Sequence, residues 1–233
     1  MRFMRPMRVM KIAGLAVAAL FSLAAARPAG DWNARIAVTP AGSHIIGNPA
    51  AALKLVEYIS YTCSHCAHFD RTAGDPLRLF YVTPGTLSIE VRHLVRDPID
   101  LTVAMLTNCG PPGKFSQNHT AFLRRQESWL ARANGAGAAQ QARWSTGDGL
   151  ARRRAIADDF GFYPIMLARG YDRPTVDRCL GDEATARRLA EQTRAAVALG
   201  VQGTPSFALN DELLAGTHDW PALQVHLKAR MTP

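Results

Sequence analysis

Hydrophobic and polar positions divide the chain into strand-like and helix-like segments. Continuous or alternating apolar runs, typical of β-strands, lie at residues 35–38, 51–60, 87–94, 206–209 and 212–215. The helical period of 3.6 residues occurs at residues 64–81, 99–107, 115–133, 150–159, 163–169, 175–180, 183–199 and 220–230. The order is strand, helix, strand, a block of helices, then helix, hairpin and helix, which predicts an α/β fold interrupted once by helices.

Local signals refine this pattern. Residues 51–60 are apolar on both faces, as expected for a strand at the centre of a sheet. A glycine and a proline late in the 64–81 helix predict a kink. The pair Asn210-Asp211 predicts a tight hairpin turn. Residues 133–149 are rich in Gly, Ala and Gln, which predicts a mobile connection.

The N-terminus has the pattern of a secretory signal. Residues 1–11 carry four basic and no acidic side chains, and residues 12–26 form an apolar run that ends in three alanines. The run is short for a membrane span, although an uncleaved anchor is an alternative. We therefore expect residues 1–26 to be a signal peptide and the protein to work in an oxidising space such as the bacterial periplasm.

Charge excludes one class of partner. The chain has 27 Lys and Arg against 19 Asp and Glu. Removal of the signal leaves 23 basic and 19 acidic residues, a formal net charge of +4 in place of +8. Basic blocks interleaved with aromatic residues are absent from the sequence, so nucleic acid is not an expected partner.

Two cysteines are the strongest chemical signal. Cys63 and Cys66 form a Cys-x-x-Cys motif that follows residues 51–60 and opens a helix. Thr62 is the predicted N-cap, which places Cys63 in the first turn, where free N–H groups and the helix dipole favour a negative sulfur. His65 can add a positive charge or a donor. These effects should lower the pKa of Cys63 from about 8.5 toward roughly 3.5–7.5 and leave Cys66 as the less exposed resolving thiol.

The same spacing has other interpretations. Zinc half-sites use it, and His65 and His68 could add ligands, so a zinc- or copper-binding periplasmic protein is one alternative. Covalent haem attachment requires a histidine directly after the second cysteine, where this chain has Ala67. A non-catalytic binding module on the same scaffold is a further alternative.

A second, distant motif supports redox chemistry. Residues 203–207 read Gly-Thr-Pro-Ser-Phe, and together with residues 56–66 they resemble the thioredoxin superfamily, and within it the DsbA group of periplasmic thiol oxidases. The resemblance covers roughly residues 42–230. It implies that Pro205 follows a cis peptide bond beside the active disulfide and that Thr204 offers its backbone to the substrate chain.

The resemblance also implies the domain organisation. The expected fold is α/β, a thioredoxin fold with a central mixed β-sheet and a large α-helical insertion. Residues 51–96 and 183–233 would form the thioredoxin-like domain and residues 97–182 the insertion, after an N-terminal lead-in at residues 27–50.

The reaction implied by the resemblance is disulfide exchange without a cofactor or metal. The Cys63-Cys66 disulfide would pass to reduced exported polypeptides, and a DsbB-like, quinone-coupled membrane protein would reoxidise the dithiol. Residues 27–50 are too few for an added dimerisation domain, so we expect a monomer. The dipeptide Ser64-His65 lacks the proline that many oxidases carry, and Thr204 also occurs at this position in isomerases and reductases. A disulfide reductase or isomerase is therefore the alternative function.

An acidic residue lies within the predicted central strand. Burial of Glu57 is costly unless the carboxyl has a partner or a role. The resembling family places an acid beneath the disulfide, where it assists proton transfer to and from the resolving cysteine. The alternative is an exposed position at the sheet edge.

The other two cysteines both fall in the helical block. An even cysteine count in an exported protein favours pairing, and a Cys109–Cys179 bridge would stabilise the fold by roughly 4 kcal/mol. Two buried free thiols or a second redox pair are the alternatives. We expect His93 and His119 to be structural.

Overall fold

The computed structural model describes residues 31–231 together with Met1. The predicted signal peptide lies outside these described residues. The strands are β1 (Ile36–Val38), β2 (His44–Gly47), β3 (Leu53–Ile59), β4 (Leu87–His93), β5 (Ser206–Leu209) and β6 (Glu212–Leu213). The α-helices are α1 (Ser64–Leu77), α2 (Pro98–Thr107), α3 (Phe115–Leu123), α4 (Gln126–Leu130), α5 (Ala138–Ser145), α6 (Gly149–Asp159), α7 (Phe162–Ala168), α8 (Arg173–Leu180), α9 (Glu183–Ala198) and α10 (Trp220–Met231). Shorter helical segments are η1 (Trp32–Ala34), η2 (Arg78–Val82), η3 (Pro112–Lys114) and η4 (Ala131–Gly135).

The strands form one mixed sheet in the order β1-β2-β4-β3-β5-β6. β3 pairs in parallel with β4 and antiparallel with β5, so the predicted central strand is central. Leu55 and Ile59 on one face of β3 belong to the large core that includes residues of α1 and α10. Val56 and Tyr58 on the other face pack in a smaller cluster with Ala196 of α9. The fold is therefore an α/β thioredoxin fold with helices on both faces of the sheet.

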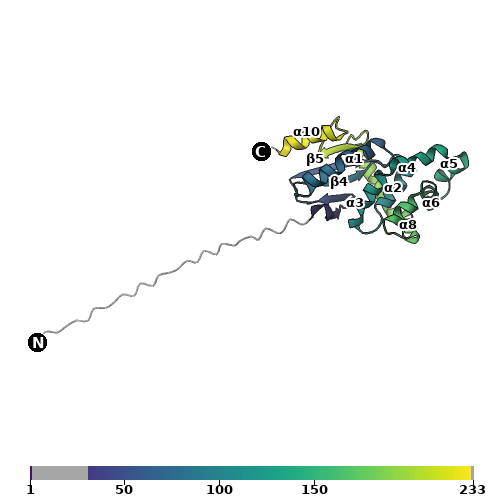
Figure 1. The fold of residues 1–233 in the computed structure, drawn as a ribbon, viewed down its shortest axis with the longest axis horizontal. Helices are drawn as coiled ribbons and strands as arrows, with labels where there is room; N and C mark the ends of the chain where they lie inside the picture. The colour runs from purple at the N-terminus through teal and green to yellow at the C-terminus, as the bar shows by residue number, and fades with distance from the viewer. Residues whose placement is uncertain (2–30, 232–233) are drawn as a thin grey trace.

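The helical block between β4 and α9 is an insertion at one end of this sheet (Figure 1). Its core is aromatic: Phe122, Phe160 and Phe162 are buried, and Trp129 packs edge-on against Phe162 with ring centroids 5.3 Å apart. Asp97 starts the block as the N-cap of α2, where its carboxylate accepts a hydrogen bond from the Asp100 backbone N–H. The insertion and the sheet thus meet directly after β4.

Several predicted elements were wrong in detail. The single predicted strand near residue 36 is a pair, because β2 lies between β1 and β4 and extends the sheet. The predicted 115–133 helix is broken into α3, α4 and η4, and the expected mobile connection at residues 133–149 contains α5. The predicted 64–81 helix ends at Leu77 and continues as the π-helical turn η2. β2 is held by pairing with both β1 and β4, a contact between distant segments that the local pattern does not encode.

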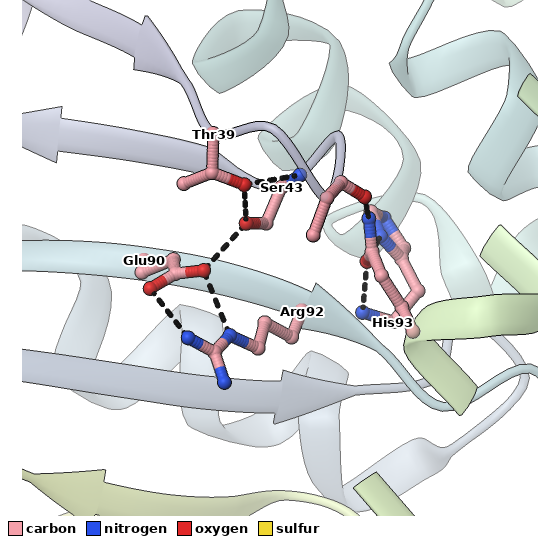
Figure 2. Close-up of polar contacts among 7 residues, drawn as sticks. Thr39, Ser43, Glu90, Arg92 and His93 are labelled. Carbon is pink, nitrogen blue, oxygen red and sulfur yellow. Dashed lines mark hydrogen bonds and ion pairs between the residues drawn. The ribbon is translucent and has the colours of Figure 1, made fainter. Parts of the chain in front are cut away.

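Polar contacts fix the strand edges beside β4. Figure 2 shows the Thr39 and Ser43 hydroxyls in contact with each other, with Ser43 donating to Glu90 of β4. Glu90 also accepts two hydrogen bonds from Arg92. At the end of the same strand, the backbone N–H of His93 donates to the Gln192 side chain of α9. Among residues 31–231, no helix is both long and apolar enough to cross a membrane.

Candidate active site

The Cys-x-x-Cys segment forms the start of α1. Cys63 itself is the N-cap and Ser64, which is exposed, is the first helical residue. The prediction of Thr62 as the N-cap was wrong, because its hydroxyl donates instead to Asp97 Oδ2 at 2.7 Å. An N-cap side chain faces the free N–H groups of the second and third helical residues. Cys63 makes no side-chain cap hydrogen bond, but the backbone N–H groups of His65 and Cys66 still favour a negative charge on its sulfur.

This position makes Cys63 acidic. The pKa of its thiol falls from an ordinary 9.0 to about 4. The largest cause is a hydrogen bond from the Cys66 thiol, and the Thr204 side chain and the backbone N–H groups of Cys66 and His65 add to it, whereas burial opposes it. His65 contributes through its backbone, while its exposed ring lines the cleft in front of Cys63. At neutral pH Cys63 is a thiolate.

Cys66 has the opposite character. Its side chain has no exposed surface, and burial raises its pKa well above the ordinary value, with the neighbouring Cys63 as the next cause. The pair is reduced in this structure, so at neutral pH it holds one thiolate and one thiol. Cys63 is itself only 5% exposed, but it lines an open cleft, whereas Cys66 is fully buried.

An open cleft of about 400 Å³ leads to Cys63. One wall is the loop before β5, in which the Thr204–Pro205 peptide bond is cis, as the resemblance implied. The Thr204 carbonyl oxygen lies 3.1 Å from Cys63 Sγ. The Thr204 hydroxyl is buried beside the two sulfurs, and it lowers the pKa of both. Any group that enters the cleft meets this loop and Cys63 together.

Two buried carboxyl groups, one on β3 and one on α1, line the same small cavity. Glu57 of β3 is only 7% exposed, so the alternative of an exposed edge position is wrong. Burial raises its pKa to about 8, the Asp70 charge adds to this, and Arg78 opposes it. Asp70 of α1 also has a raised pKa because of burial, and its Oδ2 atom lies 3.7 Å from Arg124 Nε. Both carboxyls line a cavity of about 30 Å³, which is room for a water molecule.

The insertion holds the active-site loop in place. The Asp100 carboxylate accepts hydrogen bonds from the Ser60 hydroxyl at 2.6 Å and the Tyr61 backbone N–H at 2.7 Å. The Gln126 amide donates to the carbonyl oxygens of Tyr61 at 2.6 Å and Cys63 at 2.8 Å. Asp70, Asp100 and Gln126 were missed by sequence reasoning. The available signal was weak: each is a polar residue within a helical pattern, and only the fold shows that it is buried.

The histidines expected to be structural lie behind this loop. His119 hydrogen-bonds to the Tyr61 hydroxyl at 2.9 Å, and His93 contacts Gln192. A third buried ring, His44, stacks on Phe115 with centroids 3.9 Å apart. Burial is the largest cause that lowers the pKa of His44 and His93 to about 4 and of His119 to about 3. All three are therefore neutral at pH 7, and none lines the Cys63 cleft.

The remaining cysteines are joined to each other. Cys109 and Cys179 form a disulfide between the end of α2 and α8, with Cα atoms 5.5 Å apart. This bond lies within the insertion and does not line the cleft at Cys63. Within residues 31–231, no group of three or more His, Cys, Asp or Glu side chains is arranged to hold a metal ion.

Comparisons with known proteins agree with this geometry. A family model described as thioredoxin matches residues 39–229. The crystal structure of a protein-disulfide isomerase from Novosphingobium aromaticivorans is 51% identical in sequence and covers 82% of this chain and 98% of its own, with a TM-score of 0.79. The crystal structure of α-DsbA1 from Wolbachia pipientis shares the fold at 18% identity, with a TM-score of 0.65 over 82% of this chain and 92% of its own.

A curated relative from Rickettsia prowazekii, named as a candidate protein-disulfide oxidoreductase, is 28% identical over 168 residues. The match covers 71% of this chain and 53% of the relative, so the chain spans about half the length of the curated relatives it matches. The family model covers most of the chain, and the structure has the matching sheet, dithiol and cis-proline loop. The chain therefore belongs to the thioredoxin family, in the DsbA-like form in which a block of helices interrupts the fold.

Proposed function

We propose that this protein is a periplasmic thiol:disulfide oxidoreductase that donates the Cys63–Cys66 disulfide to reduced exported polypeptides. One observation carries the proposal: an acidic Cys63 lies at the mouth of an open cleft beside the cis Thr204–Pro205 loop, with the protonated Cys66 buried behind it. The most similar solved structure reported above, named as a protein-disulfide isomerase, supports the reaction class.

The exchange has two steps. In the first, a substrate thiolate attacks Cys63 Sγ of the oxidised protein, the Cys63–Cys66 bond breaks, and Cys66 leaves and takes up a proton. A mixed disulfide between the substrate and Cys63 results. In the second, another substrate thiolate attacks the substrate sulfur of this bond, and Cys63 leaves as a thiolate. The substrate loses two electrons to the dithiol, and its new disulfide leaves the cleft.

The pKa values favour this direction of electron flow. A thiol with a low pKa leaves readily, and stabilisation of the Cys63 thiolate stabilises the reduced protein relative to its disulfide. The oxidised protein is then the stronger oxidant. In the reverse reaction Cys66 must lose its proton, and Glu57, with a pKa of about 8, is a base of suitable strength on the buried side of α1.

A disulfide isomerase is the second candidate, because the relative that is 51% identical carries that name. In this mode the reduced protein starts the cycle: the Cys63 thiolate attacks a mispaired substrate disulfide, which forms a mixed disulfide and releases one substrate thiolate. A different thiolate of the substrate then attacks the substrate sulfur of the mixed disulfide, which forms a new substrate bond and releases Cys63 as a thiolate. The two modes use the same residues and differ in whether the Cys63–Cys66 pair is kept oxidised or reduced in the cell. For the oxidase we propose a monomer that a DsbB-like membrane protein reoxidises.

The test combines an equilibrium with two activities. The protein is equilibrated with glutathione buffers, its free thiols are trapped, and peptide masses report Cys63 and Cys66 separately from Cys109 and Cys179. An oxidase stays reduced until the buffer is strongly oxidising, and it oxidises reduced ribonuclease faster than it repairs scrambled ribonuclease. A pair that remains a disulfide in strongly reducing buffer contradicts the proposed direction. Faster repair of scrambled ribonuclease identifies the isomerase, and a Cys63→Ser variant with full activity excludes both.

A further inference from the structure

A second cavity adjoins the Cys63 cleft. It also measures about 400 Å³ and lies between the segment that joins β4 to α2 and the helices α5 and α6. Arg96 lines both this cavity and the cleft. We call it the Arg96 cavity; its wall includes Val95, Arg96, Leu101, Trp144, Arg152 and Ile156. A polypeptide bound in the cleft can continue past Arg96 into this space.

Two arginines of the Arg96 cavity have guanidinium groups free to bind a ligand. The exposed Arg96 side chain makes no ion pair or hydrogen bond to any residue in the described part of the chain. Arg152 donates one hydrogen bond, to the Gly147 carbonyl oxygen at 3.2 Å, and pairs with no carboxylate of residues 31–231. Their neighbour Arg153 differs, since it is buried, donates to the Leu180 carbonyl oxygen and pairs with Glu183. A guanidinium offers five donors, so most of those on Arg96 and Arg152 have no partner within the chain.

The carboxylate that lines the same cavity is already engaged. Asp97 Oδ1 accepts a hydrogen bond from the Asp100 backbone N–H at 2.8 Å, and Asp97 Oδ2 accepts one from the Thr62 hydroxyl at 2.7 Å. Both contacts face the α2 cap and the active-site loop and leave the arginines unpaired. The Arg96 cavity therefore carries a net positive charge.

Much of the remaining wall is apolar, and packing and hydrogen bonds hold it in place. The Trp144 ring lies 4.9 Å from Phe160 between centroids, and its Nε1–H donates to Asp159 at 2.7 Å. The backbone at Arg96 is also held by hydrogen bonds. The Arg96 N–H donates to Asp100 Oδ2 at 3.0 Å, and the Val95 N–H donates to the Thr193 hydroxyl at 2.9 Å. A preformed site of this kind loses little entropy on binding.

We propose that the Arg96 cavity binds an acidic side chain of the substrate polypeptide, flanked by apolar residues, while a cysteine of the same polypeptide reacts at Cys63. This inference rests on the proposed function and adds a substrate class to it. Carboxylates pair with guanidinium groups through charged hydrogen bonds, and the apolar wall accommodates the neighbouring side chains. Arg96 and Arg152 would then set specificity without taking part in the exchange itself.

The test uses reduced peptides with two cysteines and one variable residue. That residue is Glu, Gln or Lys, placed roughly two to eight positions to either side of the cysteines, because an extended chain rises about 3.3 Å per residue. The oxidised protein is mixed with each peptide, and acid quenching with mass analysis gives the second-order rate of peptide oxidation. The protein variants are Arg96→Gln with Arg152→Gln and, as a matched control, Arg154→Gln. Arg154 is on the same helix but pairs with Asp177 and lines neither cavity.

We expect the best Glu peptide to react about fivefold faster than its Gln counterpart at low salt, and the Lys peptide to react more slowly than both. The double variant should lose this difference, the Arg154→Gln control should keep it, and added salt should reduce it. Equal rates for Glu and Gln peptides with the unmodified protein, or a preference that persists in the double variant, would overturn the inference. Failure to oxidise any peptide would instead refute the proposed function, and the inference with it.

Discussion

The low pKa of Cys63 predicts how the redox equilibrium of the protein changes with pH. Between about pH 5 and about pH 8 the reduced pair holds one proton, because Cys63 has a pKa of about 4 and that of Cys66 is raised. Two glutathione molecules hold two protons over the same range, since a thiol with an ordinary pKa near 8.5 is protonated there. Oxidation of the protein by glutathione disulfide therefore consumes one proton.

The magnitude follows from this proton count. The equilibrium constant for oxidation should fall about tenfold for each unit by which the pH rises, so that reduced protein becomes favoured. This is about 1.4 kcal/mol, or about 30 mV for a two-electron couple. The same reasoning applies to stability. The pKa of Cys63 is lower in the folded protein than in the unfolded chain, so its contribution to the stability of the reduced form is present at high pH and is lost as pH falls toward 4.

The assay is the glutathione equilibrium at several pH values in this range, with free thiols trapped after acid quenching. The Cys109–Cys179 bond is followed by mass in the same samples and serves as an internal control. An equilibrium constant that does not change with pH would refute the reasoning, because it would mean that Cys63 and Cys66 are both protonated up to about pH 8. A Cys63 pKa near its ordinary value would also remove the physical basis for the direction of electron flow proposed above.

Three further predictions follow from buried groups. Glu57→Gln should slow the attack of Cys66 on the mixed disulfide between Cys63 and substrate about tenfold and should remove an inflection near pH 8 from the pH profile of this rate. Glu90→Gln on the adjacent strand should keep the rate and the inflection. An unchanged profile in Glu57→Gln would exclude a proton-transfer role. The oxidised protein should lose about 2 kcal/mol of stability as the pH falls from about 6.5 to about 5, as measured by urea unfolding, because the three buried histidines bind protons only after unfolding. Glu57 and Asp100, with pKa values raised by burial to about 8 and about 6, bind protons in the folded protein and offset part of this loss. Higher stability at pH 5 would contradict these assignments. Replacement of both Cys109 and Cys179 by Ala should lower the free energy of unfolding by about 4 kcal/mol, since the bridge closes a loop of 70 residues; unfolding curves that superimpose on those of the unmodified protein would show that the bridge contributes nothing.

The sequence alone predicted the order of most elements and the candidate reacting pair. Apolar periodicity depends on nearest neighbours along the chain, so β3, α1, α9 and α10 could be placed within a few residues. The Cys-x-x-Cys spacing is likewise local, because it fixes both sulfurs on one helical turn. The cis bond before Pro205 was available only through resemblance, since spacing carries no information about peptide isomers.

Tertiary structure decided the surroundings of that pair. Thr62 has the side chain of an N-cap, yet its hydroxyl donates to Asp97 at the start of the insertion, and Cys63 is the N-cap residue of α1. Gln126 lies within the predicted 115–133 helix, and the helix breaks near it so that its amide reaches the active-site loop. A polar residue gives the same sequence signal whether its side chain faces solvent or another layer of the fold. Only the packing of the insertion against the sheet determines which of these two environments it has.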